Sequence, residues 1–512
     1  MASTLRKSAY IALKVQTMYR RDVVDSFIPS GSASRRTTER TPQSVPSALQ
    51  FQGIAAILRR RSLMSSATVT PESPLASALR KARWRILPLV CILYFIAYLD
   101  RNNVGFAREE MSESLNLSAS AFGLAAGLFF IGYTIFEIPS NAGMHRFGAR
   151  RWIARILIPW GLLAMGTAFV VDDVSFSIVR LLLGIAEAGF FPAVVFYLTL
   201  WFPVRQRAAI LGVFVLAQPI ANMLGAPISG LLLQMHGIAG LHGWQWMFLV
   251  EGFPAVIFGL IVPFVMTDHP AAARWLTDVE KAALERTIAE DAVRIASTGA
   301  SFSVALRSPL AWGYALLNFG MVLGIYGLAF WLPSIVSELG DFAPLQRGLV
   351  VAVPYAAGAS FVLWWSGRAD RTGKRALHVA VSLGTAALGL VVAGFSLAFS
   401  PILAIAALCV VSIGVYTAIG PMLSMSASLF VGPAAAAGIA LVGSVGNIAG
   451  FVSPVVVGWL IDATGSTQAG VLFLASALGA TAIATVVFAG RRPEGNTELA
   501  FRISQSTSSH SV

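Results

Sequence analysis

The residues with the clearest chemical potential in this chain are a few charged side chains inside apolar stretches. Asp100 and Arg101 stand side by side near the end of the first long apolar run. Arg180 and Glu187 lie in a later run, seven residues apart, which places them two turns apart on one face of a helix. An ionisable residue inside a membrane span costs about 2.5–3.5 kcal/mol on insertion scales, so these residues mark a candidate functional site.

Three of these charges are expected to lie at one depth in the membrane. A helix rises about 1.5 Å per residue and the hydrocarbon core is about 30 Å thick, which puts Asp100, Arg101 and Arg180 all roughly 21–23 Å from the same boundary. Arginine can hold a substrate carboxylate bidentately, and an ionised Asp100 would compete for the arginines. Protonation of Asp100 would then release an arginine for the anion. Glu187, with no base assigned beside it, is the second predicted proton-coupling group.

Two other interpretations of these charges stay open at this point. Asp100 and Arg101 could lie at the membrane interface if the first span ends at Leu99, because long charged side chains reach toward water. Arg180 and Glu187 could instead form a fixed clamp between helices, although buried ion pairs are weak evidence for a stabilising role.

The composition is that of a membrane protein. Of the 512 residues 56% are hydrophobic and only 12% are charged, whereas a soluble domain carries roughly 25% charged residues. The net charge of +12 does not indicate a nucleic-acid-binding surface, because the bases between the apolar runs cluster in short loops. Cys91 and Cys409 both lie inside apolar runs and are expected to be buried thiols rather than a disulfide or a metal pair.

Twelve apolar stretches have the length of about 20 residues that a membrane span requires. One long connection separates the first six from the last six. The predicted fold is therefore an all-α membrane protein with twelve transmembrane helices in two six-helix bundles. The predicted spans are 86–106, 121–143, 152–171, 174–200, 208–233, 244–266, 310–337, 346–367, 377–399, 402–429, 436–461 and 469–490.

The loops alternate in charge along the chain. Bases precede span 1 and follow spans 2, 4, 8 and 12, whereas the opposite loops carry acids such as Glu109, Glu110 and Asp172. By the positive-inside rule this pattern places both termini in the cytoplasm. The predicted location is the plasma membrane, which is the inner membrane in a bacterium.

The chain divides into five predicted regions. They are a disordered basic tail (1–81), an N-terminal bundle (82–267), a cytoplasmic linker (268–306), a C-terminal bundle (307–492) and a disordered C-terminal tail (493–512). The Arg- and Ser-rich, acid-poor composition of the first tail also fits a transit peptide, or translated upstream sequence if the true start is Met64.

The linker contains one predicted surface helix. Thr277 and Glu280 have the spacing of a capping box, in which each residue bonds the backbone N–H of the other. The apolar stripe of this helix is expected to consist of Val279, Ala283, Leu284 and Ile288.

A short basic motif follows the second span of each half, at His145–Arg151 and at Asp370–Arg375. It resembles the Gly-x-x-x-Asp-Arg-x-Gly-Arg/Lys-Arg/Lys signature of the major facilitator superfamily, whose loop controls opening at the cytoplasmic face. The first copy departs from this pattern, since Asn141 replaces the glycine and His145 replaces the aspartate. The resemblance implies a gating role for Arg146, Arg150, Asp370 and Arg371.

Further motifs resemble the anion:cation symporter branch of that superfamily, over about residues 84–490. In that branch the substrates are organic anions such as galactonate, tartrate and phthalate, and most bacterial members couple transport to protons. The motifs are Tyr98-Leu-Asp-Arg-Asn102, Phe136-Glu-Ile-Pro-Ser-Asn141, Arg180-x6-Glu187-Ala-Gly-Phe190, Trp201-Phe-Pro203, Phe330-Trp-Leu-Pro333 and Gly446-Asn-Ile-Ala-Gly-Phe451.

The resemblance implies a set of site residues. It makes Asp100 and Glu187 the protonation sites, and it makes substrate contacts of Tyr98, Arg101, Tyr133, Arg180 and Gln218. The predicted binding set also includes Asn222, on the same helix face as Gln218, and Tyr326, on one face of span 7 with Asn318. It ends with Asn447, the amide closest to Gly443, where the family pattern has an asparagine.

The predicted function is secondary active transport, as proton-coupled import of a sugar acid, a tartrate-like dicarboxylate or an aromatic carboxylate. An organic-anion exporter or antiporter, or a non-transporting membrane sensor, are the alternatives. No nucleotide-binding, hydrolase or His/Cys metal motif occurs in the sequence, which argues against an enzyme, a metal site or ATP-driven transport. The expected partners are the small-molecule anion, protons as coupling ion and the lipid bilayer, with no cofactor, no nucleic acid and function as a monomer.

Overall fold

A computed structural model describes residues 73–296, 306–427 and 433–488 of the chain. The chain divides into two compact units, Met1–Ser77 and Ala78–Val512, and the contacts below lie within the second unit. The predictions of disorder for residues 1–72 and 493–512, and the alternatives for the first tail, concern stretches outside the described residues.

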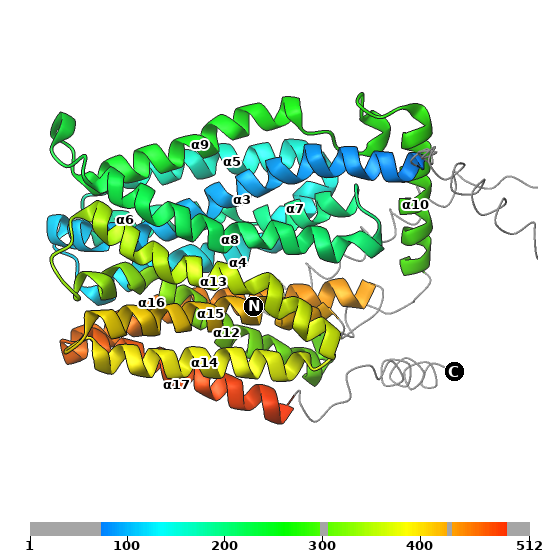
Figure 1. Ribbon diagram of the computed structural model, residues 1–512. Helices are drawn as coiled ribbons and strands as arrows, with labels where there is room; N and C mark the ends of the chain where they lie inside the picture. Colours follow the sequence, from blue (N-terminus) through cyan, green and yellow to red (C-terminus); the bar gives the residue numbers. More distant parts are fainter. Residues whose placement is uncertain (1–72, 297–305, 428–432, 489–512) are drawn as a thin grey trace, which may run out of the picture. The chain divides into compact units, whose positions relative to one another are not determined.

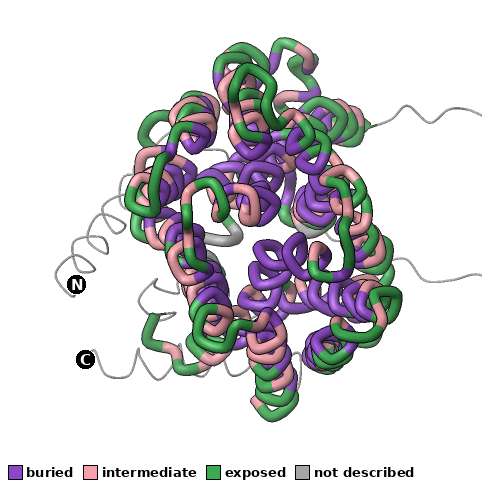
Figure 2. The backbone as a smooth tube through the Cα atoms, turned by 90° about the vertical axis from the view of Figure 1, so that its left-hand side faces the viewer, coloured by how far each residue is buried: buried purple, intermediate pink, exposed green. Residues whose placement is uncertain are grey.

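Twelve of the described helical segments are long and apolar enough to cross a membrane, as predicted. They run roughly side by side, while α10 lies across one end (Figure 1). Seen along the helices, buried segments gather in the middle, and exposed ones lie around the rim and in the loops (Figure 2). The spans of the first half are α3 (Pro74–Leu115), α4 (Ala119–Phe147), α5 (Ala149–Gly166), α6 (Asp173–Glu187) with α7 (Phe190–Thr199), α8 (Val204–Leu233) and α9 (Gly243–Val265). Those of the second half are α12 (Pro309–Ser337), α13 (Pro344–Thr372), α14 (Arg375–Ser396), α15 (Pro401–Ala427), α16 (Pro433–Thr464) and α17 (Thr467–Phe488).

Two pairs of helices bring the halves into close contact toward one end of the bundle. α4 packs against α16, and α8 packs against α13. Glycine permits both contacts, because a Cβ on Gly123 of α4 would lie 2.2 Å from the carbonyl oxygen of Pro454, and one on Gly348 of α13 would lie 2.4 Å from that of Ala226. Both close approaches lie toward the end opposite α10, which we call the far end.

The fourth span is broken rather than continuous, which differs from the predicted span 174–200. α6 ends at Glu187, and α7 begins at Phe190. Gly189 between them has φ 84°, a conformation that glycine adopts without steric cost. The break therefore follows directly after a buried acid of the candidate site.

The first helix starts at Pro74, inside the stretch 1–81 predicted as a tail. Ala78, Leu79 and Ala82 are buried on this first part of α3, and Lys81 forms an ion pair of 2.8 Å with Glu280 of α10. A short apolar stripe and one ion pair thus extend the helix beyond the predicted membrane span.

The linker helix α10 (Asp278–Ala296) begins with the predicted capping box. The Thr277 backbone N–H donates to the Glu280 carboxylate at 2.9 Å, and the Glu280 N–H donates to the Thr277 hydroxyl at 3.3 Å. The predicted stripe is only partly correct: Leu284 is fully buried, but Val279 is 65% exposed. Glu280 takes its place on the buried face, because the carboxylate is satisfied by the cap and by Lys81.

Candidate functional site

Five charged side chains are buried inside the described spans of the first half. Asp100 and Arg101 lie on α3, Arg180 and Glu187 on α6, and Glu251 on α9. Arg180 and Glu187 are 0% exposed, and Arg101, the most exposed of the five, is 8% exposed. We call these residues the buried charge cluster. The alternative that Asp100 and Arg101 are interfacial is wrong, because neither side chain reaches the surface.

Arg101 and Glu187 form a buried ion pair between α3 and α6. The same guanidinium donates a hydrogen bond of 3.2 Å to the hydroxyl of Tyr326 on α12. Arg101 therefore links two helices of the first half to one of the second. The prediction that Glu187 lacks a basic partner is wrong, because the long Arg101 side chain spans the separation between their positions along the helices. Arg180 is not the partner of Glu187, so the predicted clamp between those two residues is absent from this part of the structure.

Asp100 is held by an indole rather than by the adjacent arginine. The Trp160 Nε1–H of α5 donates to the Asp100 carboxylate at 2.7 Å. Arg180 is close enough to act on Asp100 electrostatically, but no hydrogen bond joins them in the described structure. The predicted direct pairing of Asp100 with Arg101 is therefore replaced by two separate sets, Arg101 with Glu187 and Arg180 near Asp100.

Arg180 is the member of the cluster with the most unused hydrogen-bonding capacity. None of its three guanidinium nitrogens has a hydrogen-bond partner among the described residues, although the side chain is fully buried. The guanidinium lies 4.9 Å from the centre of the Phe129 ring, which is also 5.2 Å from the guanidinium of Arg101. Buried donors are normally satisfied, and the planar guanidinium fits a carboxylate, so this arrangement can accept an anion.

Two predicted tyrosines surround Arg101. The guanidinium lies 5.2 Å from the ring centre of Tyr98 on α3 and 5.3 Å from that of Tyr133 on α4. Aromatic faces attract a cation without neutralising its charge, so they can hold Arg101 in place while leaving it available to an anion.

A chain of amides leads from α3 into the second half. The Asn102 side-chain amide donates to the Asn222 carbonyl oxygen, and the Asn222 amide donates to the Tyr416 hydroxyl at 2.5 Å. Gln218, one turn before Asn222 on α8, is buried as well. Asn102 and Tyr416 were not predicted as site residues, although a polar residue inside an apolar span is a signal that could have identified Asn102.

A small cavity lies between the halves beside this chain of amides. Its volume is about 10 Å³, which is room for about one water molecule. Its walls include Tyr98, Asn103, Asn222 and Ser229 from α3 and α8, and Tyr355 from α13. The second half thus contributes the hydroxyls of Tyr326, Tyr355 and Tyr416 to the region, while the first half contributes the charges.

The role of Asn447 as a substrate contact stays a prediction. Asn447 neighbours Glu137 on α4, and Ser444 of the same helix α16 donates to the Glu137 carboxylate at 3.4 Å. Glu137 belongs to the contact between the halves.

The predicted gating residues lie at the helix ends that flank the turns after α4 and α13. The Arg150 backbone N–H donates to Asp268 at 2.9 Å, and this carboxylate also pairs with its guanidinium at 3.6 Å. Asp370 pairs with Arg375 at 3.1 Å. Arg146 and Arg371 are exposed. The first motif therefore contacts the start of the linker at Asp268, whereas the ion pair of the second motif lies within the motif.

Acidic residues close the far end between the two halves. Glu109 of α3 contacts Arg347 of α13 and Ser337 of α12. Asp462 of α16 accepts hydrogen bonds from the backbone N–H groups of Ala119, at 3.1 Å, and Ser120, at 2.8 Å, at the start of α4. These charged contacts join the same halves that the glycine contacts bring together.

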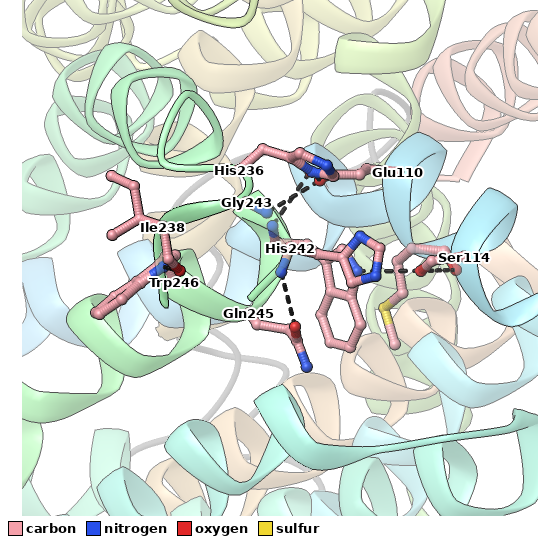
Figure 3. A network of polar contacts seen from close by, with 10 residues as sticks. Glu110, Ser114, His236, Ile238, His242, Gly243, Gln245 and Trp246 are labelled. Carbon is pink, nitrogen blue, oxygen red and sulfur yellow. Dashed lines mark hydrogen bonds and ion pairs between the residues drawn. The ribbon is translucent and has the colours of Figure 1, made fainter. Parts of the chain in front are cut away.

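The neighbouring acid, Glu110, holds the start of α9 instead. Its carboxylate accepts from the backbone N–H groups of Gly243 at 2.9 Å and Trp244 at 3.2 Å, and it contacts the His236 ring at 2.5 Å (Figure 3). One ligand atom each of Glu110, His236 and His242 lies within 4.8 Å of the others, a cluster that no sequence motif predicts. The contacts of Glu110 are those of an anion at a helix N-terminus, which stabilises the orphan N–H groups.

Known proteins with similar sequences agree with this architecture. Residues 90–454 match the family model of the Major Facilitator Superfamily. This chain belongs to that superfamily. A "Putative tartrate transporter" of Agrobacterium vitis is 43% identical over 423 residues, which cover 82% of this chain and 97% of that protein. A "Quinolone resistance transporter" of Acinetobacter baumannii is 40% identical over 397 residues, or 77% of this chain and 91% of that protein.

The fold of this superfamily member also occurs in solved structures. A crystal structure of a D-xylose–proton symporter superposes with a TM-score of 0.64 at 16% identity, covering 81% of this chain and 98% of that one. The predicted family and the fold of twelve helices in two bundles are thereby confirmed. The superfamily member is a multi-pass inner-membrane transporter and not an enzyme, because the superfamily and the relatives consist of transporters.

Proposed function

We propose that this transporter imports a small organic anion together with protons. The observation that carries the proposal is Arg180, a fully buried guanidinium whose three nitrogens lack hydrogen-bond partners in the described structure. A substrate carboxylate can bind it bidentately and supply the missing acceptors. The second guanidinium, of Arg101, is paired with Glu187 and becomes available when that acid is protonated.

The substrate class follows from the surroundings of the two arginines. Two guanidiniums suit a dicarboxylate or a carboxylate with a second polar end, and the relatives named tartrate transporters point to the same chemistry. Tyr98, Tyr133, Gln218 and Asn222 offer hydroxyls and amides to the hydroxyls of a sugar acid. The rings of Tyr98 and Tyr133 could also pack against the ring of an aromatic carboxylate. We therefore take L-tartrate as the first substrate to test.

Proton coupling arises from competition between acids and substrate. Ionised Asp100 acts on Arg180, and ionised Glu187 pairs with Arg101. Each acid therefore competes with the substrate anion for one arginine. Protonating either acid removes its negative charge and favours the anion. Bound anion and bound proton thus stabilise each other, which is the requirement for symport.

The orientation is proposed from charge. The α10 end carries the basic loops and is assigned to the cytoplasm by the positive-inside rule, with both termini on that side. The far end, where Glu109 and Asp462 join the halves, then faces outward. In this assignment the structure corresponds to a state closed to the outside, and Arg146, Arg150, Asp370 and Arg371 act at the cytoplasmic face. The transporter works as a monomer, because the buried charge cluster is complete within one chain.

Uptake into proteoliposomes tests the proposal. Labelled L-tartrate should accumulate under an inward-directed proton gradient, and accumulation should collapse when a protonophore removes that gradient. A sodium gradient of equal size, without a pH difference, serves as the control and should drive no accumulation. Uptake that ignores the proton gradient would refute the coupling, and failure of a panel of carboxylates to bind would refute the substrate class.

Export is the second candidate, and the 40% identity to a quinolone resistance transporter favours it. Intact cells distinguish the two directions. Cells that express an importer accumulate external tartrate, whereas cells that express an exporter retain less of a preloaded anion or quinolone than control cells do.

A further inference from the structure

Glu251 is a buried acid that the proposed transport cycle does not use. It lies on α9 and is 1% exposed. The Ser229 hydroxyl of α8 donates to one carboxylate oxygen at 2.7 Å, and the other oxygen has no hydrogen-bond partner among the described residues. No base forms an ion pair with it in this part of the chain. A lone carboxylate is costly to bury, so the protonated form is the one that suits this position.

The whole buried charge cluster shows the same imbalance. Asp100, Glu187 and Glu251 supply three carboxyl groups, whereas Arg101 and Arg180 supply two guanidiniums. With every group ionised the cluster would carry one net negative charge, from three negative and two positive groups. One carboxyl must hold a proton for the cluster to be neutral, and Glu251 is the acid without a basic neighbour.

The neighbours of Glu251 connect it both to Asp100 and to the cavity. On α3, the Asn103 amide lies beside the carboxyl groups of Asp100 and Glu251, and Asp100 is the titratable group that acts on Glu251 electrostatically. On α8, Ser229 is the hydrogen-bond donor. Asn103 and Ser229 both line the cavity between the halves. On the remaining side, α5 packs its backbone at Met165 against Gly252.

We propose that Glu251 is a proton-binding site of the transport cycle, which holds the extra proton of the buried charge cluster and exchanges it with Asp100. This inference rests on the proposed proton-coupled function. In the exchange, the O–H bond of the Glu251 carboxyl breaks and one forms on the Asp100 carboxylate, with no other bond changed. The resulting Glu251 carboxylate accepts the Ser229 hydrogen bond, and water in the cavity can return a proton through that hydroxyl.

The exchange gives Asp100 a local proton source. Asp100 itself is enclosed by Trp160 and Arg180, and its proton would otherwise have to cross the arginine that the substrate occupies. A route through Glu251 approaches Asp100 from the opposite neighbour, Asn103. Substrate and proton can therefore enter the cluster from different sides.

Glu251→Gln tests the proposal in proteoliposomes, with Ser229→Ala as the matched control. The glutamine keeps the size and hydrogen bonding of the protonated acid but cannot exchange a proton. The number of protons carried per tartrate, measured from the reversal potential, should fall by one, and the pH dependence of tartrate exchange should flatten. Ser229→Ala removes the hydrogen bond but leaves the acid, so it should slow exchange without changing the proton count.

The outcomes separate this inference from the proposed function. If wild-type uptake is coupled to protons but Glu251→Gln keeps the wild-type proton count and pH profile, Glu251 is a structural residue and only the inference is overturned. If wild-type uptake is uncoupled, the proposed function fails first. If Glu251→Gln does not fold, Glu251→Asp decides: a displaced but titratable carboxyl should keep the proton count and shift the pH profile, and an unchanged profile overturns the inference.

Discussion

Arg101 and Glu187 form a buried ion pair at the residue where the fourth span breaks. α6 ends at Glu187, and the chain turns at Gly189 before α7 begins. Arg101 also donates to Tyr326 across the boundary between the halves. A change in the charge of Glu187 therefore affects the ion pair with Arg101, which is an arginine of the anion site. It also acts at the end of α6 and, through Arg101, at the contact between the halves.

Glu187→Gln should make the transporter less stable alone and more responsive to its substrate. Removing one partner of a buried ion pair typically costs about 3–5 kcal/mol, because the remaining charge stays buried without compensation. A bound anion replaces the lost negative charge, so tartrate should raise Tm more in the variant than in the wild type. Thermal unfolding with and without tartrate measures both effects. Glu285→Gln, at an exposed position of α10, is the control, and equal tartrate shifts in the two variants would contradict the prediction.

Arg180→Lys should weaken anion binding while keeping the positive charge. An ammonium is a compact charge and cannot reproduce the planar fork of the guanidinium. We expect the Kd for tartrate to rise roughly 10- to 100-fold, or about 1.4–2.8 kcal/mol. Isothermal titration of the purified protein measures it. Arg155→Lys is the matched control, because Arg155 is exposed and stacks on Trp152 at 4.5 Å. A variant at position 180 that binds like this control would exclude Arg180 from the site.

Gly189→Ala should destabilise the broken span. The residue has φ 84°, and an added Cβ would lie 2.3 Å from the Ser140 hydroxyl. Strain of this kind costs on the order of 1–3 kcal/mol. Gly166→Ala is the contrasting substitution, since Gly166 is helical and a Cβ there meets nothing within 4 Å. Its effect should be neutral or stabilising by up to about 1 kcal/mol. Similar Tm values for the two variants would show that the break tolerates a side chain.

The positions of the spans follow from the sequence because length and hydropathy are local properties. The capping box of α10 is local too, and both of its hydrogen bonds form. Charges inside apolar runs likewise identify Asp100, Arg101, Arg180 and Glu187 as buried, because each is costly in lipid. The same rule applies to Glu251, an acid in the middle of the sixth span, which the sequence reasoning passed over.

Partners across the bundle could not be predicted in this way. Periodicity shows which face of its own helix a residue occupies, but it does not show which other helix lies against that face. Trp160 as the donor to Asp100 and Tyr416 as the partner of Asn222 depend on the packing of α5 and α15. The pairing of Arg101 with Glu187 depends in addition on a long, flexible side chain, for which Cα depth is a poor guide.

The closed far end depends on Glu109, which contacts Arg347 and Ser337 of the second half. Glu109→Gln removes the charge of a half-exposed ion pair between the halves. Such pairs contribute up to about 1 kcal/mol, so the closed state should lose roughly fivefold in population relative to states open at this end. The contacts of Asp462 with the start of α4 remain in the variant, and the shift should therefore be partial.

Spin labels on exposed far-end positions of opposite halves report this shift. Cysteines at Ile238, in the loop between α8 and α9, and at Asp341, in the loop between α12 and α13, provide such a pair. Pulsed dipolar spectroscopy should show a longer-distance population that grows in Glu109→Gln. Glu113→Gln is the control, because Glu113 is exposed on the same helix. If both variants give the wild-type distance distribution, Glu109 does not hold the halves together, and the closure rests on other contacts, such as those of Asp462 with α4 and those at Gly123 and Gly348.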